Sequence, residues 1–195
     1  MQTVLLVVMS YILGMLPAAY ITGRRIKGID VYHIGDNNPG ASNVYRHVGH
    51  VAGFMVLGID IGKGAAAVVL ARVFSSEPVA MLCGLGVVAG HNWPVLFHFK
   101  GGRGLSTSIG VLWALVPIPM AVGSGIGIVS LWMRQNLLRT GVFTFVPMLA
   151  VAWLVGVSVS LMLYSVGLLC ISGLMHLLST RHLSPEQKQE SLRWA

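Results

Sequence analysis

The chain has 195 residues, of which 55% are hydrophobic and only 10% are charged, and its formal net charge is +7. This composition excludes a water-soluble domain, in which about a quarter of the residues are charged, and a disordered chain, which requires low hydrophobicity. It also excludes a disulfide scaffold, because the two cysteines, Cys83 and Cys170, both lie in apolar stretches.

The remaining class is an all-α integral membrane protein, which we expect to form a single polytopic domain over residues 1–195. The expected spans are the stretches without Asp, Glu, Lys or Arg, namely residues 1–23, 78–99, 104–133 and 140–180, together with 47–76, which Asp60, Lys63 and Arg72 interrupt. A span needs about 20 apolar residues, so residues 1–23 predict one helix and residues 140–180 predict two. Residues 104–133 predict either one long helix or a hairpin of two short helices around residues 116–119.

The distribution of basic residues favours the hairpin. With it the chain has about seven transmembrane helices, its N-terminus outside and its C-terminus in the cytoplasm, and most basic residues lie on the inner face. These inner-face residues are Arg24, Arg25, Lys27, Arg46, Lys100, Arg103, Arg134, Arg139, Arg181, Lys188 and Arg193. A single long helix would divide them between the two faces. After residue 180 we expect a short helix that begins at Ser184 and Pro185.

The first polar feature is the loop GDNNPGASNVYR, which runs from Gly35 to Arg46. Glycine and asparagine tolerate positive φ angles, so successive N–H groups can face one way and form an anion-binding concavity. A helix that begins directly afterwards adds its dipole, and Arg46 adds a full charge. The same pattern is also typical of an ordinary turn that caps a helix. The candidate binding residues in this loop are Asn38, Gly40, Ser42, Asn43 and Arg46.

The second feature is the pair Asp60 and Lys63, which are three residues apart and therefore share one face of an apolar helix. Charges inside a membrane segment are costly, so they face protein or a water-filled cavity. Two interpretations stay open. Either the pair neutralises itself and fixes helix packing, or Lys63 joins an anion site and Asp60 orients it.

The third feature joins His91 and Pro94 to the glycine-rich run FKGGRG at residues 99–104, which hydroxyl residues follow. Such a run lets backbone donors approach a phosphate closely, while Lys and Arg neutralise its charge and hydroxyls donate at the helix start. The alternative is a positively charged anchor between two helices. His91 itself is either catalytic or a hydrogen-bonded interfacial residue. The candidate residues are His91, Lys100, Gly101, Gly102, Arg103, Gly104 and Thr107.

Both loops emerge on the expected inner face, so they predict a basic, glycine-rich pocket that binds phosphate groups. Nucleic acid is not an expected partner, because the charges are scattered at helix ends and form no stripe.

In these features the chain resembles the bacterial acyl-phosphate-dependent glycerol-3-phosphate acyltransferases, small polytopic membrane enzymes that make lysophosphatidic acid. The family's first motif, G-S-G-N-P-G-A-T-N followed by Arg, resembles residues 35–46. Its second motif, Asp-x-x-Lys-Gly, is matched by Asp60, Lys63 and Gly64. Its third motif, G-H-x-x-P followed by F-K-G-G-K-G-x-A-T, resembles residues 90–94 and 99–107. The chain departs from the family at Asp36 and Asn37, where the family has Ser and Gly. In the C-terminal His-x-x-Asn-x-x-Arg motif only His176 matches.

The resemblance implies acyl transfer from an acyl phosphate to glycerol 3-phosphate for phospholipid synthesis, among membrane lipids, at the cytoplasmic face of the bacterial inner membrane. It implies no cofactor, no metal and no covalent enzyme intermediate, since the donor is already activated. His91 and Lys100 are then catalytic, Asp60 is orienting, and Lys63 and His176 join the loop residues above in binding substrate. The alternatives are a diverged paralogue with another acceptor or no catalysis, a non-catalytic subunit, and an anion transporter.

Overall fold

The computed structural model describes residues 1–133 and 136–193, and within these ranges it contains helices and no strand. The helices are α1 (Gln2–Gly14), α2 (Ala18–Lys27), η1 (Val31–His33), α3 (Ala41–His47), α4 (His50–Phe74), α5 (Glu77–Asn92), η2 (Val95–Phe97), α6 (Leu105–Leu115), α7 (Pro117–Trp132), α8 (Leu137–Leu154), α9 (Val159–Thr180) and α10 (Pro185–Ser191). The expected all-α class is therefore confirmed.

Four segments are long and apolar enough to cross a membrane: Gln2–Lys27, His50–Phe74, Glu77–Phe97 and Val159–Thr180. Three further apolar helices are shorter: Leu105–Leu115, Pro117–Trp132 and Arg139–Leu154. The prediction of about seven spans requires these three helices to cross as well, and it stays a prediction.

Residues 104–133 form the hairpin and not one long helix. The helices α6 and α7 meet at Val116, and Pro117 opens α7. Proline lacks an N–H, and the first turn of a helix has no internal acceptor for that N–H, so proline is well placed at this position. Residues 140–180 likewise contain two helices, because the chain breaks between α8 and α9 at residues 155–158.

The expected helix over residues 1–23 lies within one candidate span, Gln2–Lys27, but the prediction that this helix is continuous is wrong. The chain breaks between α1 and α2, where Pro17 precedes the first residue of α2. A proline ring excludes the helical N–H bond at its own position and disfavours the helical region for the preceding residue, Leu16. At the other end of the chain, the expected start of α10 is confirmed, since Ser184 forms a capping box with Gln187.

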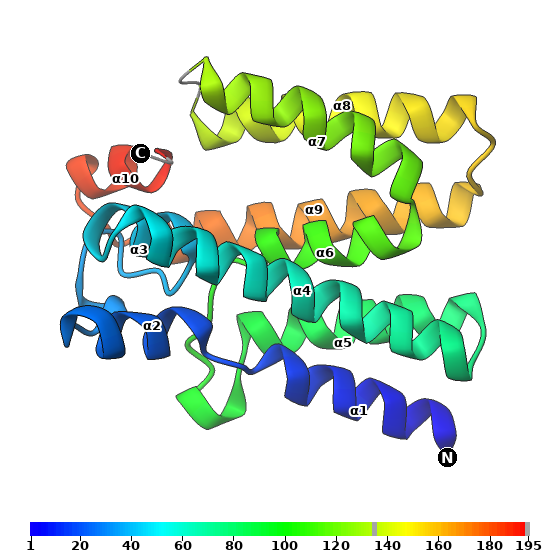
Figure 1. Cartoon of the computed structure of the whole chain (residues 1–195), viewed down its shortest axis with the longest axis horizontal. Helices are drawn as coiled ribbons and strands as arrows, with labels where there is room; N and C mark the ends of the chain where they lie inside the picture. Colours follow the sequence, from blue (N-terminus) through cyan, green and yellow to red (C-terminus); the bar gives the residue numbers. More distant parts are fainter. Residues whose placement is uncertain (134–135, 194–195) are drawn as a thin grey trace.

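Figure 1 shows α1, α4, α5, α6 and α9 alongside one another, with α7 and α8 paired on one side of them. The short helices α2, α3 and α10 lie at the end opposite the N-terminus. The two long loops, residues 28–40 and 93–104, meet at this end, where Asp36 and Arg103 form an ion pair. We call this end of the molecule, with α2, α3, α10 and these two loops, the loop end.

The main core lies between α4, α5, α6 and α9, with Val68, Val87, Leu112 and Leu168 fully buried. A second, smaller cluster around Val31, Val44 and Val56 supports the loop end. The candidate site lies between these two clusters and is therefore held by packed helices on both sides.

Candidate functional site

A buried charged cluster joins α4 to α5. Lys63 Nζ lies 2.7 Å from Asp60 Oδ1 and 2.8 Å from His91 Nδ1, and His91 Nδ1 lies 3.6 Å from the same Asp60 oxygen. Lys63 also donates to the carbonyl oxygen of Leu16 at 3.3 Å, which lies at the break between α1 and α2. As expected, Asp60 and Lys63 lie on the same face of α4, and this face is directed toward His91.

The contact with Lys63 defines how His91 can act. An ammonium group only donates, so Nδ1 of His91 accepts, and the proton of the neutral ring lies on Nε2. Nε2 faces the glycine-rich run, because a Cβ placed on Gly102 would lie only 2.3 Å from it. His91 therefore presents a hydrogen-bond donor to the run.

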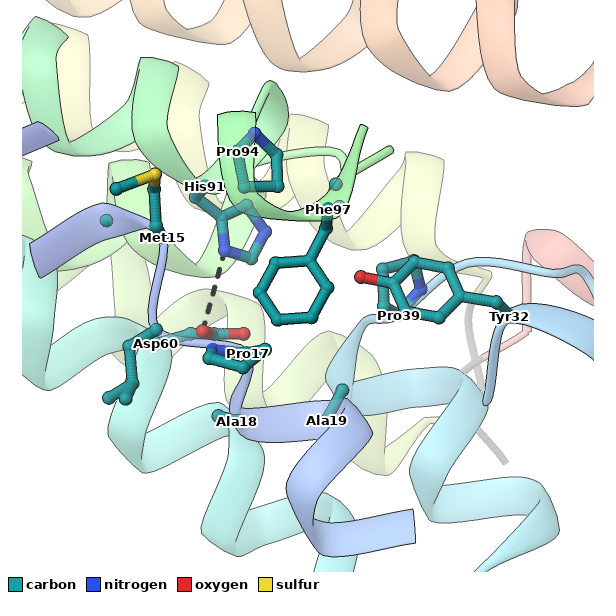
Figure 2. A pocket seen from close by; sticks show the side chains of 14 residues that line it. Met15, Pro17, Ala18, Ala19, Tyr32, Pro39, Asp60, His91, Pro94 and Phe97 are labelled. Atoms are coloured by element: carbon teal, nitrogen blue, oxygen red, sulfur yellow. Dashed lines mark ion pairs between the residues drawn. The ribbon is translucent and has the colours of Figure 1, made fainter. Parts of the chain in front are cut away.

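Two cavities adjoin this cluster, and Asp60 and His91 line both. The small cavity has a volume of about 20 Å³. Figure 2 shows the His91 ring directed at the Asp60 carboxylate, with Phe97 and Tyr32 on the far side of the cavity. Gly101 and Gly102 also contribute to its wall.

The large cavity has a volume of about 250 Å³ and is amphipathic. Its polar wall contains Asn38, Gly40, Ser42, Arg103, Gly104 and His176 together with Asp60 and His91, and its apolar wall contains Leu105, Leu137, Val142, Phe145 and Leu169. Ser191 at the end of α10 and the following Leu192 also line this cavity. A pocket lined by both charged and apolar side chains suits a ligand that has an anionic head and a hydrocarbon tail.

Arg103 is the cation in the wall of the large cavity. Its Nε donates to Ser179 Oγ at 3.0 Å, and its Nη2 lies 3.0 Å from Asp36 Oδ2. Burial lowers the pKa of Arg103, and the Asp36 carboxylate opposes that shift. The carboxylate thereby favours the charged guanidinium that an anionic ligand requires.

The glycines of the run allow it to pack against the end of α5. A Cβ on Gly101 would lie 2.1 Å from the His91 carbonyl oxygen, and one on Gly104 would lie 2.4 Å from Asn92 Oδ1. Gly104 also has a φ of 81°, in the left-handed region. The run therefore needs glycine to reach His91 and Asn92, whether or not its amides also contact a phosphate.

Three predicted residues of the first loop, Asn38, Gly40 and Ser42, line the large cavity. Asn43 does not. Its buried Nδ2 donates to the carbonyl oxygens of Val31, Ile34 and Asn38, so Asn43 stabilises the backbone conformation of the loop. The amide nitrogen is fully used in this role.

Several other predicted site residues lie away from both cavities. Lys100 is exposed and lines neither cavity, and it follows His98 and Phe99, which both have a left-handed backbone conformation. Thr107 is buried where α4 contacts α6, and a Cβ on Gly64 would lie 2.2 Å from its carbonyl oxygen. Thr107 therefore belongs to the packing between these two helices.

Lys63 and Arg46 also line neither cavity. Lys63 contacts Nδ1 of His91, whereas Arg46 pairs with Asp36 and with Glu190 of α10.

Of the expected inner-face residues, Arg134 lies outside the described residues. Within residues 1–133 and 136–193, no group of three or more His, Cys, Asp or Glu side chains could hold a metal ion.

Sequence patterns did not predict the roles of Asp36, Glu190, Tyr32 and Phe97. Asp36 pairs with Arg103 across 67 positions in the chain, and Glu190 pairs with Arg46 across 144. No local spacing signals contacts at such separations. Tyr32 and Phe97 carry no pattern that distinguishes them from other aromatic residues at a membrane interface.

Comparison with known proteins finds both similar sequences and similar structures. The family described as glycerol-3-phosphate acyltransferase matches residues 4–187. The chain is 36% identical over 178 residues to glycerol-3-phosphate acyltransferase 4 of Dehalococcoides mccartyi, and this alignment covers 91% of this chain and 96% of the relative. It is 35% identical over 156 residues to the glycerol-3-phosphate acyltransferase of a Thermoanaerobacter species, covering 78% and 79%.

The fold is similar to two crystal structures of PlsY (YgiH), an integral membrane glycerol 3-phosphate acyltransferase. For the glycerol 3-phosphate form the TM-score is 0.81 at 26% identity, covering 94% of this chain and 92% of that chain. For the lysophosphatidic acid form the TM-score is 0.81 at 25% identity, covering 98% and 99%.

Proposed function

Because the chain belongs to the glycerol-3-phosphate acyltransferase family, we infer that it is an integral membrane enzyme that acylates glycerol 3-phosphate for phospholipid synthesis. The observation that carries this assignment to particular residues is the amphipathic large cavity. Arg103, Asp60 and His91 line this cavity together with several apolar side chains.

The proposed acyl donor is a fatty acyl phosphate. This mixed anhydride is already activated, so the reaction needs no nucleophilic residue of the enzyme. The chain is compatible with that requirement, because it has no G-x-S-x-G motif and neither cysteine lines either cavity. Catalysis then consists of holding two anionic substrates together and stabilising the charge that develops on the transferring group.

The proposed binding mode follows the polarity of the large cavity. A phosphate lies against Arg103, near Asn38, Gly40 and Ser42, and His176 lies in the same wall. The acyl chain lies between α6, α8 and α9, among the apolar residues that line the large cavity. In this binding mode the acyl carbonyl lies near His91, which lines the same cavity.

In the proposed reaction, the primary hydroxyl oxygen of glycerol 3-phosphate attacks the acyl carbonyl carbon, and the bond from that carbon to the phosphate oxygen breaks. An ester forms and inorganic phosphate leaves. Nε2 of His91 carries a proton and therefore donates a hydrogen bond to a substrate oxygen during this step. The proton of the attacking hydroxyl then passes to a substrate phosphate, and Lys63 and Asp60 hold the His91 ring in place.

The proposed topology has about seven spans in a bacterial inner membrane, with the N-terminus outside and the loop end in the cytoplasm. The loop end has Arg24, Arg25 and Lys27 in the last turn of α2, together with Arg46, Arg103 and the basic residues of α10 and its surroundings. Arg72 lies at the other end of α4. This asymmetry supports a cytoplasmic loop end by the positive-inside rule.

The test is a turnover assay of the purified protein in detergent and in proteoliposomes. Palmitoyl phosphate and glycerol 3-phosphate are expected to yield lysophosphatidic acid and inorganic phosphate in equal amounts, and palmitoyl-coenzyme A serves as the alternative donor. Product from the thioester alone would contradict the donor assignment. Uptake of glycerol 3-phosphate into proteoliposomes without any product would contradict the enzyme assignment and favour a transporter.

A further inference from the structure

Asp36 is a buried carboxylate that lies between two guanidinium groups. Its Oδ2 lies 3.0 Å from Arg103 Nη2 and its Oδ1 lies 3.6 Å from Arg46 Nη2, while its side chain has 0% exposure. Removing a charged group from water is costly unless it is paired, and two buried guanidinium groups without a carboxylate would repel each other. Asp36 therefore compensates both arginines at once.

Asp36 itself lines neither cavity, whereas Arg103 lines the large one. A ligand in the large cavity can therefore contact the guanidinium of Arg103 but not the carboxylate of Asp36. Asp36 contacts Arg103 directly, so this guanidinium is the group through which it is placed to act on a bound phosphate.

The contacts of Arg103 limit its orientation. Nε donates to Ser179, and Nη2 lies at ion-pair distance from Asp36, although in the part of the chain that the structure describes neither Nη2 nor the Asp36 oxygens make a hydrogen bond. Within the described residues Nη1 makes no hydrogen bond with protein, and its two N–H groups stay available. A guanidinium held by one hydrogen bond and one ion pair has a restricted orientation, which reduces the entropy that phosphate binding would otherwise cost.

Arg46 connects the same carboxylate to the C-terminal segment. Its Nε lies 3.3 Å from Glu190 Oε1 on α10, and Glu190 also contacts His47 at 2.6 Å. The result is a series of alternating charges formed by Glu190, Arg46, Asp36 and Arg103. Its last member, Arg103, donates to Ser179 of α9. Asp36 is the member of this series that joins the first loop to the glycine-rich run.

We propose that Asp36 is a positioning residue, which holds the Arg103 guanidinium in the wall of the large cavity so that its free N–H groups meet the phosphate of glycerol 3-phosphate. This proposal rests on the proposed function, because it assigns that substrate to the cavity. It assigns to Asp36 a role through Arg103 and no contact with the substrate.

The main test is the steady-state kinetics of Asp36→Asn, which preserves the shape of the side chain and removes its charge. We expect the KM for glycerol 3-phosphate to rise about tenfold, the cost of one weakened charge-assisted hydrogen bond, while kcat changes by less than about threefold. The KM for the acyl donor serves as an internal comparison and is expected to change less.

The matched control is Asp30→Asn, the same substitution in the same loop. Asp30 also pairs with an arginine, Arg24, at 3.2 Å, but it lines neither cavity. Its side chain caps η1, and asparagine caps equally well. The KM of this variant is expected to equal that of the unmodified protein.

A double-mutant cycle separates positioning from a general effect on the fold. In an Arg103→Ala background, Asp36→Asn is expected to raise the KM no further, because the group through which it acts is absent. If Asp36→Asn does not fold in detergent, Asp36→Ser replaces it in the same cycle, and thermal unfolding of every variant is recorded.

An unchanged KM in Asp36→Asn, or an equal rise in both backgrounds, would overturn the proposal. Absence of lysophosphatidic acid from the unmodified protein would instead overturn the proposed function, so the two failures are distinguishable.

Discussion

Lys63 Nζ lies 2.8 Å from Nδ1 of His91, in a position where only the lysine can donate. The same ammonium group lies 2.7 Å from Asp60. This arrangement gives His91 one defined tautomer, with its proton on Nε2 toward the glycine-rich run. The proposed role of His91 is therefore that of a hydrogen-bond donor and not of a base that takes a proton from the substrate.

His91→Gln tests this role against His91→Ala. A glutamine amide nitrogen can stand close to the position of Nε2 and donate, but it cannot act as a base. We expect kcat/KM to fall at least about 100-fold in His91→Ala and less than about tenfold in His91→Gln. Equal losses in the two variants would favour a general base at His91.

The Asp60–Lys63 pair is expected to separate stability from activity. In Lys63→Met the buried Asp60 loses its partner, so the free energy of unfolding should fall by about 3–5 kcal/mol. In the double variant Asp60→Leu/Lys63→Met no charge is left unpaired, so stability should return while activity stays low, because His91 is no longer oriented. Thermal unfolding in detergent and the turnover assay measure the two effects.

The control for this pair is Glu77→Gln, which breaks the exposed ion pair between Glu77 and Arg72 at 3.3 Å. An exposed pair contributes less than about 1 kcal/mol, so both stability and turnover should stay close to those of the unmodified protein. Full activity in the Asp60→Leu/Lys63→Met variant would contradict the orienting role.

Gly102→Ala should disturb His91 directly. The added Cβ would lie 2.3 Å from Nε2, so the ring or the glycine-rich run has to move. We expect kcat to fall at least about tenfold, since small displacements of a catalytic group are costly. Gly167→Ala on α9 is the matched control, because its Cβ would meet nothing within 4 Å and its activity should not change. Wild-type turnover in Gly102→Ala would show that His91 needs no such fit.

The pattern of charges predicted most of the fold, because lipid excludes charged side chains and so forces them to the ends of the spans. It separated the hairpin of α6 and α7 from a single helix, although both have the same apolar sequence. The break between α1 and α2 was missed even though Pro17 signals it, because a charge-free stretch says nothing about continuity. Hydropathy predicts whether a segment can lie in the membrane, whereas a proline predicts where the hydrogen bonds of a helix are interrupted.

The candidate site was predicted in part. Asp60 and Lys63 were found because a charge is costly inside an apolar helix and therefore faces other polar groups. His91 was found through its place shortly before the glycine-rich run. Lys100, Asn43 and Thr107 were grouped with them by position in a motif, but the direction of each side chain depends on how the loops pack. The ion pairs of Asp36 and Glu190 join residues far apart in sequence, and only the packed structure reveals them.

Lys100 and Arg103 are expected to differ sharply in importance, although both are cations of the same run. Lys100→Ala should change kcat/KM by less than about threefold, because the exposed side chain lines neither cavity. Arg103→Ala should lower kcat/KM at least about 100-fold through the loss of a buried charge in the wall of the large cavity. Comparable losses in the two variants, measured in the same detergent assay, would show that Lys100 reaches the substrate.

Leu169→Trp tests whether the apolar wall of the large cavity holds the acyl chain. The larger side chain would fill part of a volume of about 250 Å³ and shorten the space beyond the polar end. We expect the ratio of kcat/KM for palmitoyl phosphate to that for lauroyl phosphate to fall at least about tenfold, because several methylene groups of the longer chain lose their burial at about 0.8 kcal/mol each. The control is Leu163→Trp on the same helix, whose side chain is exposed and lines neither cavity, so the ratio should be unchanged. If Leu169→Trp alters both donors equally, the hydrocarbon chain lies elsewhere.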